Sequence, residues 1–197
     1  MATFERCVAV GGVALFPADT VYGLATEPDS REGVERLYRI KGRRPDRPAA
    51  VMFFDLELAL AALPELGGRT RAALPRLLPG AVTLVLPNPA RRYPLACGPV
   101  PDRLGLRVPA LAGALAPLAA ARWPVLQSSA NPSGGADPRR LADVDDRIRA
   151  GVDLQLDGGE LPGTPSSVVD LGSYEETGEW SLLRAGALPA EAIEAAL

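Results

Sequence analysis

The chain has 197 residues, 47% of them hydrophobic, and a formal net charge of -3 at pH 7. This length fits one domain, residues 1–197, that can bury a core without disulfides or metal ions. The acidic net charge argues against binding of nucleic acid through a diffuse basic surface, and the absence of histidine excludes Ser-His-Asp catalysis, Cys-His catalysis and histidine-ligated metals.

The two cysteines, Cys7 and Cys97, have no CxxC or CxxH spacing, so neither a disulfide framework nor a zinc site is predicted. Glu5 and Arg6 interrupt the N-terminal stretch where a signal peptide would need its apolar run. No apolar stretch approaches the length of a membrane span. We therefore expect a cytoplasmic protein with no membrane partner.

Short apolar runs rich in β-branched residues recur along the chain and predict strands. In chain order they lie within 11–17, 20–26, 48–54, 81–87, 104–109, 124–129, 152–157, 166–171 and 179–186. Helical patterns are predicted over 31–41, 56–63, 69–78, 111–122, 139–149 and 190–196. The alternation indicates an α/β fold, and the irregular segment 91–101 is expected to be a surface loop.

The helix predicted over 31–41 ends at Lys41, the one lysine in a chain with 21 lysine and arginine residues in total. Ser30 is its expected N-cap and Gly42 its expected C-cap. Cations at this place could simply favour the helix dipole. Yet lysine is a compact point charge suited to a phosphate oxygen, which favours an anion site made by Lys41 and Arg43, with Arg47 as an addition.

The segment QSSANPSGG, residues 127–135, follows an apolar run and carries small polar side chains and glycines. Such a loop can cradle a phosphate or nucleotide, although Asn-Pro and Ser-Gly also mark ordinary turns. Neither a Rossmann fingerprint nor a P-loop is present. Further candidates stand at the ends of apolar runs: Thr20, Arg107, Ser166 and Arg184.

Taken in order, seven segments resemble the YrdC-like family of threonylcarbamoyl-AMP synthases. They are PADTVYGL, KGRRPDRPA, PGAVTLVLP, GLRVP, SSANPSG, SSVVD and LLRAG, and the resemblance covers roughly residues 11–188. Each segment is weak evidence by itself, whereas seven in the right order are specific. The resemblance implies a twisted mixed α/β sheet with flanking helices around a basic concave cleft.

The resemblance also implies a reaction in which L-threonine, bicarbonate or CO2, and ATP give threonylcarbamoyl-AMP and pyrophosphate. Downstream proteins would use the product to modify tRNA, and Mg²⁺ would arrive with ATP, so that no protein-held metal is expected. By the family's pattern, Lys41 and Arg43 would be catalytic. The residues expected to bind ATP are Lys41, Arg43, Arg47, Ser129, Asn131 and Arg184, and those expected to bind threonine are Thr20, Arg107 and Ser166.

Two other functions stay open at this point. The chain could be a divergent YciO-like paralogue or another enzyme that adenylates a different carbamate. It could also be a non-catalytic module that binds tRNA or double-stranded RNA, although the acidic net charge and the few aromatic residues count against that class.

Overall fold

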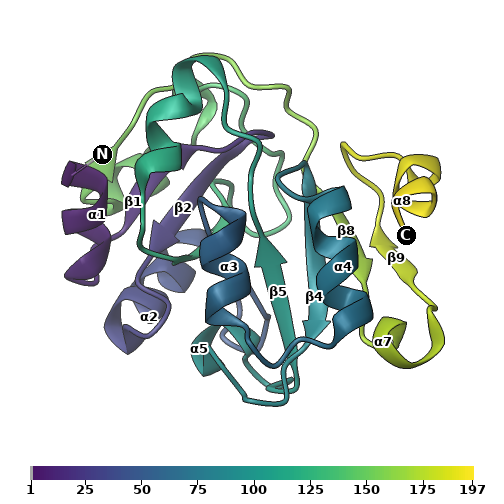
Figure 1. The fold of residues 1–197 in the computed structure, drawn as a ribbon. Helices are drawn as coiled ribbons and strands as arrows, with labels where there is room; N and C mark the ends of the chain where they lie inside the picture. The colour runs from purple at the N-terminus through teal and green to yellow at the C-terminus, as the bar shows by residue number, and fades with distance from the viewer. Residues whose placement is uncertain (1) are drawn as a thin grey trace.

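One mixed sheet organises the protein, of which the computed structural model describes residues 2–197 (Figure 1). In these residues nine strands pair in the order β7-β1-β2-β6-β3-β5-β4-β8-β9. The strands are β1 Ala14–Pro17, β2 Tyr22–Thr26, β3 Ala50–Met52, β4 Val82–Pro87, β5 Arg103–Arg107, β6 Val125–Ser129, β7 Leu154–Gln155, β8 Ser167–Asp170 and β9 Ser181–Arg184.

Each predicted apolar run overlaps one of these strands; eight runs contain their strand, and β5 begins one residue before its run, at Arg103. Three pairs are parallel, namely β1 with β7, β3 with β5, and β4 with β8. The other neighbouring pairs are antiparallel. The predicted fold class, a mixed α/β sheet with flanking helices, is therefore confirmed.

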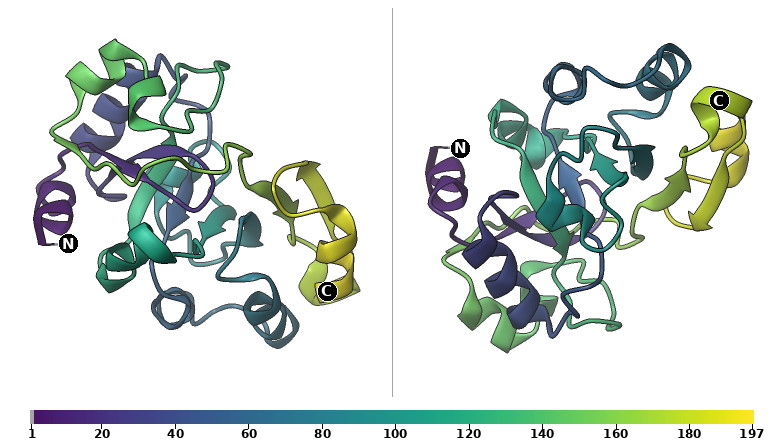
Figure 2. Two further views of the ribbon diagram at one scale, coloured as in Figure 1. Left: turned by 90° about the horizontal axis from the view of Figure 1, so that it is seen from above. Right: turned by 90° about the horizontal axis from the view of Figure 1, so that it is seen from below.

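Helices cover the sheet and its ends. They are α1 Ala2–Ala9, α2 Arg31–Lys41, α3 Leu56–Ala62, α4 Gly68–Leu77, α5 Pro94–Cys97, α6 Asp146–Gly151, α7 Tyr174–Thr177 and α8 Ala190–Ala196, with 3₁₀ segments η1 Gly113–Ala120 and η2 Leu141–Asp143. Figure 1 shows α3 and α4 in front of β5 and β4. Both views of Figure 2 place the C-terminal unit of β9, α7 and α8 at the opposite end of the molecule from α1.

Four predicted helices are confirmed: α2 and α8 at the predicted bounds, and α3 and α4 within one residue of them. The helix predicted over 111–122 is instead a 3₁₀ segment with Pro117 inside it. The prediction over 139–149 was wrong in its length, because the chain forms η2 and then α6. Asp145 caps α6 by accepting a hydrogen bond from the Arg147 amide at 2.8 Å, which starts a new helix in the middle of the predicted one.

Helix α1 was not predicted, and it closes one end of the core. It buries Phe4 and Val8 on one face. The Phe4 ring packs against Phe16 and Phe54, with centroids 5.5 and 5.6 Å apart. None of the helices in residues 2–197 has the length and apolarity needed to span a bilayer.

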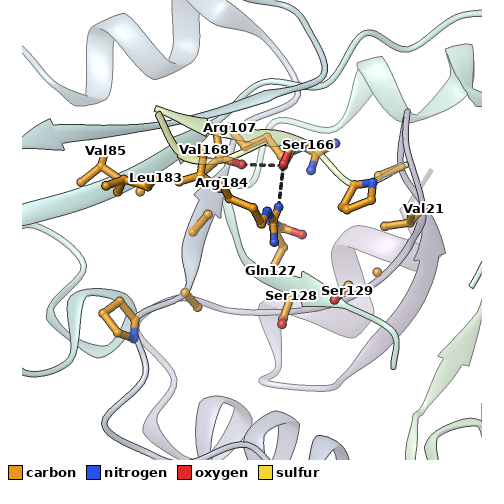
Figure 3. Close-up of a pocket in the computed structure, with 18 of the residues that line it drawn as sticks. Val21, Val85, Arg107, Gln127, Ser128, Ser129, Ser166, Val168, Leu183 and Arg184 are labelled. Carbon is orange, nitrogen blue, oxygen red and sulfur yellow. Dashed lines mark hydrogen bonds between the residues drawn. The ribbon is translucent and has the colours of Figure 1, made fainter. Parts of the chain in front are cut away.

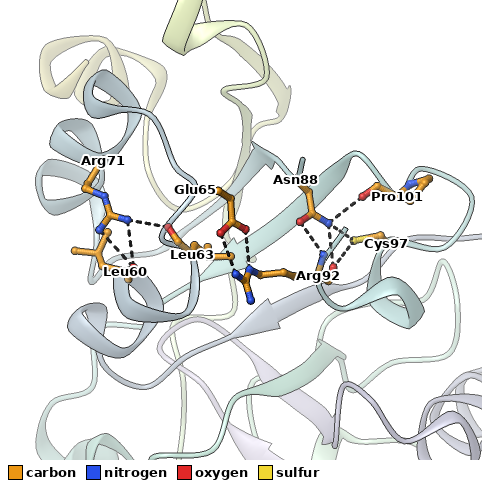
Figure 4. A network of polar contacts seen from close by, with 8 residues as sticks. All are labelled: Leu60, Leu63, Glu65, Arg71, Asn88, Arg92, Cys97 and Pro101. Carbon is orange, nitrogen blue, oxygen red and sulfur yellow. Dashed lines mark hydrogen bonds and ion pairs between the residues drawn. The ribbon is translucent and has the colours of Figure 1, made fainter. Parts of the chain in front are cut away.

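The segment 91–101 is more ordered than the sequence indicates, since it contains α5 and buries Ala96 and Cys97. Buried Asn88 closes its ends: Nδ2 donates to the carbonyls of Arg92 and Pro101 at 3.0 and 2.9 Å (Figure 4). The Arg92 side chain in turn pairs with Glu65 at 2.7 Å. The loop is therefore a fixed wall beside the start of β5.

Candidate functional site

A cavity of about 460 Å³ opens on one face of the sheet, above strands that run from β2 to β9. Strand β5 shows how it is built. Arg103, Gly105 and Arg107 line the cavity, whereas the residues between them, Leu104 and Leu106, are buried in the core. Since successive side chains of a strand point to opposite faces, the cavity and the core occupy opposite sides of β5.

Small residues make the middle of this face hollow. Gly23, Ala50 and Gly105 come from β2, β3 and β5, and all three line the cavity. Ala50 and Gly105 are direct cross-strand partners. A Cβ on Gly105 would lie 3.2 Å from the Cα of Ala50, a tight contact, so glycine suits the close approach of β3 and β5 at this point.

Four guanidinium groups stand around this hollow: those of Arg43, Arg103, Arg107 and Arg184. None of the described residues that line the cavity is a carboxylate. Arg103 pairs with Asp170 at 2.9 Å, and Arg107 pairs with Asp19. Within residues 2–197 no carboxylate lies within 4 Å of the Arg43 or Arg184 guanidinium. The cavity is therefore suited to an anionic ligand.

Arg184 reaches into the cavity from the edge strand β9. In Figure 3 its guanidinium points between Ser166 and Gln127. Its Nη2 donates to the Ser166 carbonyl at 2.7 Å, and the Ser166 hydroxyl shares a hydrogen bond of 2.9 Å with the Thr83 hydroxyl. Arg107, Thr83, Val168 and Arg184 are successive partners across β5, β4, β8 and β9, so one row of the sheet places two cations and the Thr83 hydroxyl on the same wall.

Arg107 is buried, and its position is fixed from behind. Its Nη2 donates to Asp19 and, at 2.7 Å, to the Thr20 hydroxyl, while the Ala110 amide donates to Asp19 at 3.0 Å. The buried Nε of Arg107 has no hydrogen-bond partner within the described part of the chain. This nitrogen is shielded from solvent, so it is the rest of the Arg107 side chain, which lines the cavity, that can face a ligand.

Arg43 is aimed by the end of helix α2. Gly42 adopts the left-handed conformation with φ of 60°, and the amides of Gly42 and Arg43 donate to the carbonyls of Arg39 and Tyr38 at 3.1 and 2.8 Å. The predicted caps, Ser30 and Gly42, are thereby confirmed. The cap turns the chain so that the Arg43 guanidinium lies over the Tyr38 ring, 5.5 Å from its centroid, and lines the cavity.

Lys41, two residues earlier, is buried and does not line the cavity. Its Nζ donates to the carbonyl of Ser129, to the carbonyl of Asn131 at 2.7 Å and to Asn131 Oδ1 at 3.1 Å. Burial, and then the nearby charge of Arg43, lower the pKa of Lys41 to about 8, and Asp137 opposes this shift. In this structure its ammonium group therefore binds the segment 129–131 of the protein.

Residues 6–186 match the family model Sua5_yciO_yrdC, which is described as "Telomere recombination". The chain belongs to the Sua5/YciO/YrdC family. A threonylcarbamoyl-AMP synthase of Pyrococcus abyssi is 32% identical over 93% of the chain, and one of Hahella chejuensis is 31% identical over 84%. The chain spans 53% of the length of the first relative and 92% of the second.

Among solved structures of this family, P. abyssi Sua5 complexed with L-threonine superposes with a TM-score of 0.83. It is 29% identical to the chain, of which it covers 99%, while the chain covers 56% of that protein. The similarity therefore extends over the whole sheet and its cavity.

Five of the residues expected from the resemblance to this family meet at the cavity: Arg43, Arg107, Ser129, Ser166 and Arg184. Thr20 and Asn131 are buried behind the lining, where they contact Arg107 and Lys41 respectively. Arg47 is exposed and does not line the cavity. Lys41 was expected to reach the triphosphate, but all three of its donors are directed to protein acceptors instead.

Four other polar residues line the cavity: Gln127 and Ser128, which lie in the candidate segment 127–135, and Thr83 and Arg103, which the sequence did not single out. Alternation along a strand was the available signal for two of them. Arg103 precedes Arg107 by four residues and Thr83 lies on the neighbouring strand opposite Arg107, so both face the same side of the sheet. Pairing of β4 with β5 could not be read from the sequence, and this pairing brings Thr83 into the site.

Proposed function

We propose that the protein is an L-threonylcarbamoyladenylate synthase, which forms threonylcarbamoyl-AMP and pyrophosphate from L-threonine, bicarbonate or CO2, and ATP. The observation that carries the proposal is the cavity itself, which has four guanidiniums in its lining and no carboxylate among the described residues that line it. Its relatives named threonylcarbamoyl-AMP synthase support the same reaction.

The reaction needs no histidine. The neutral amine of threonine reacts with CO2 to give a carbamate and a proton, or with bicarbonate to give a carbamate and water, and the carbamate oxygen is already an anion. That oxygen attacks the α-phosphorus of ATP in line, a new P–O bond forms, and pyrophosphate leaves with the electrons of the broken P–O bond. The enzyme must hold two anionic reactants together and stabilise the leaving group, which is work for fixed cations and hydroxyls.

We assign the phosphates of ATP to Arg43, Ser129 and Arg184, because the two guanidiniums lack carboxylate partners in the described chain and all three line the cavity. We assign threonine to Arg107 and Ser166. A guanidinium that lines the cavity can donate to a carboxylate, and Thr20 would orient it from behind. The solved complex of P. abyssi Sua5 contains L-threonine, which supports a threonine site in this fold.

Magnesium enters the proposal with ATP. Residues 2–197 contain no group of three or more His, Cys, Asp or Glu side chains arranged to hold a metal ion. Mg²⁺ keeps several waters and commonly binds substrate phosphates in nucleotide enzymes. We propose that the nucleotide brings the ion and that the arginines complete the neutralisation of the triphosphate.

The product, an acyl-type phosphate anhydride, would be consumed by downstream proteins that transfer the threonylcarbamoyl group to tRNA. A cytoplasmic location fits this use, and both cysteines, Cys7 and Cys97, are free thiols.

Release of pyrophosphate from ATP tests the proposal. It should require both L-threonine and bicarbonate, and L-threonine should be preferred over L-serine. Release that does not depend on threonine would instead indicate an enzyme that adenylates another carbamate. A lack of release, together with binding of double-stranded RNA that weakens with salt, would indicate an RNA-binding module.

A further inference from the structure

Lys41 has no part in the chemistry proposed above, although it is the only lysine of the chain. Its ammonium group has three N–H donors, and the structure supplies three acceptors within the segment 129–131. The residue is 3% exposed. A buried cation with every donor engaged by protein has no donor left for a ligand.

The acceptors belong to a loop that is connected to Lys41 at several points. Ser129 Oγ donates to Asn131 Oδ1 at 2.6 Å, and Asn131 Nδ2 donates to the Gly135 carbonyl at 2.5 Å. The Ser133 amide donates to the Lys41 carbonyl at 2.9 Å. The loop 129–135 therefore closes around the last residue of α2, which it contacts through both main chain and side chain.

This arrangement explains why a lysine stands here in a chain that otherwise uses arginine. The three acceptors converge on a single atom, which a tetrahedral ammonium satisfies and a planar guanidinium fork does not. An apolar residue of similar length would leave the carbonyls of Ser129 and Asn131 buried without this donor.

We infer that Lys41 is a positioning residue: it fixes the loop 129–135, and through it the hydroxyl of Ser129 at the cavity wall, without touching the substrate. The inference rests on the proposed function for the identity of the ligand at Ser129. The end of α2 thus directs two neighbouring cations to different tasks, since Lys41 holds the loop and Arg43 faces the cavity.

Amine modification of the ligand-free protein tests the inference directly. Because the chain has one lysine, peptide mapping after mild acylation reports on Lys41 and the N-terminal amine alone. The matched control is Arg184→Lys, which places a lysine at the exposed rim of the cavity. Lys41 should react at least about tenfold more slowly than the control lysine, since modification requires the loop to open.

Addition of Mg-ATP separates the two roles further. It should protect the control lysine in Arg184→Lys and change the modification rate of Lys41 by less than about twofold. Rapid modification of Lys41 in the free protein, with strong protection by Mg-ATP, would overturn the inference. It would indicate that Lys41 contacts the triphosphate of ATP.

Hydrogen exchange and kinetics provide the second test. In ligand-free Lys41→Met, amides of the loop 129–135 should exchange at least about tenfold faster, whereas Arg184→Ala should leave them unchanged. The KM for ATP should rise in Lys41→Met, and adding Ser129→Ala to this variant should raise it little further. Unchanged loop exchange in Lys41→Met would overturn the inference.

The two proposals can fail separately. Acylation and hydrogen exchange use the free protein, so they report on Lys41 even if no threonine-dependent release of pyrophosphate is found. If Lys41→Met does not fold, the modification rates of the wild type and Arg184→Lys still decide the matter.

Discussion

Lys41 at the end of α2 and Arg184 on the edge strand β9 carry the same charge in opposite surroundings. Lys41 is buried, with three protein acceptors around one nitrogen. Arg184 is exposed and lacks a carboxylate partner within residues 2–197, and it points into the cavity. The comparison teaches that a cation's role depends on which of its donors are already engaged.

Arg107 stands between these two cases. It is buried like Lys41 and ion-paired with Asp19, yet it lines the cavity like Arg184. If the comparison is correct, loss of Arg107 should impair both folding and binding, loss of Lys41 should act through a loop, and loss of Arg184 should affect binding alone.

The largest effect is expected for Arg107→Met. It leaves the Asp19 carboxylate buried without its cation, which should lower the free energy of unfolding by about 3–5 kcal/mol. Urea unfolding measures this change, and threonine-dependent release of pyrophosphate should be lost. The control is the double variant Asp19→Asn, Arg107→Met, which should recover part of the stability without recovering activity. If the single variant, the double variant and the wild type were equally stable, the Arg107–Asp19 pair would not stabilise the fold and the comparison would be wrong.

The next effect concerns the pH dependence of stability. The pKa of Lys41 falls from its ordinary value of 10.5 to about 8 because of burial and the charge of Arg43, against the opposing charge of Asp137. Between these values the unfolded chain binds a proton that the folded protein has released. The Lys41 contribution to the free energy of unfolding should therefore rise with pH, by at most about 3 kcal/mol.

Urea unfolding of the wild type and of Lys41→Met at pH 7, 8, 9 and 10 isolates this contribution. The stability of the wild type relative to the variant should increase over this range. A constant difference would show that folding does not lower the pKa of Lys41 within this pH range. That result would contradict the burial of Lys41 on which the comparison with Arg184 depends.

A smaller effect is expected for Ser166→Ala. The hydroxyls of Thr83 and Ser166 are buried and bonded to each other at 2.9 Å, so removal of one leaves the other without this partner, at a cost of about 1–2 kcal/mol. The KM for threonine should rise as well. Thr83→Val combined with Ser166→Ala should cost less stability than the sum of the single changes, and simple additivity would contradict the pairing.

The smallest effect on stability belongs to Arg184→Ala, whose free energy of unfolding should stay within about 0.5 kcal/mol of the wild type because the side chain is exposed. Its affinity for ATP should nevertheless fall by roughly tenfold or more, as expected for loss of a charge-assisted hydrogen bond. Isothermal titration with a non-hydrolysable ATP analogue measures this loss. Unchanged affinity would sink the assignment of Arg184 to the triphosphate.

Much of the fold followed from local patterns. All nine apolar runs overlap strands. Helix α2 begins and ends at the predicted residues because its caps, Ser30 and Gly42, depend only on residues next to them in the chain. Predictions failed where longer-range packing or a competing cap decided the outcome. Helix α1 is stabilised by Phe4 against Phe16 and Phe54, and Asp145 restarts the helix within 139–149.

The sequence by itself determined the α/β class, the capped helix that ends at Lys41, and the identity of five cavity residues through ordered motifs. Only the tertiary structure decided what each cation contacts. Lys41 and its acceptors are 88 and 90 residues apart in the chain, and Arg107 and Asp19 are 88 apart. A local pattern can place a charge at the end of an element, but the strand order decides which donors are buried against carbonyls and which stay open to a ligand.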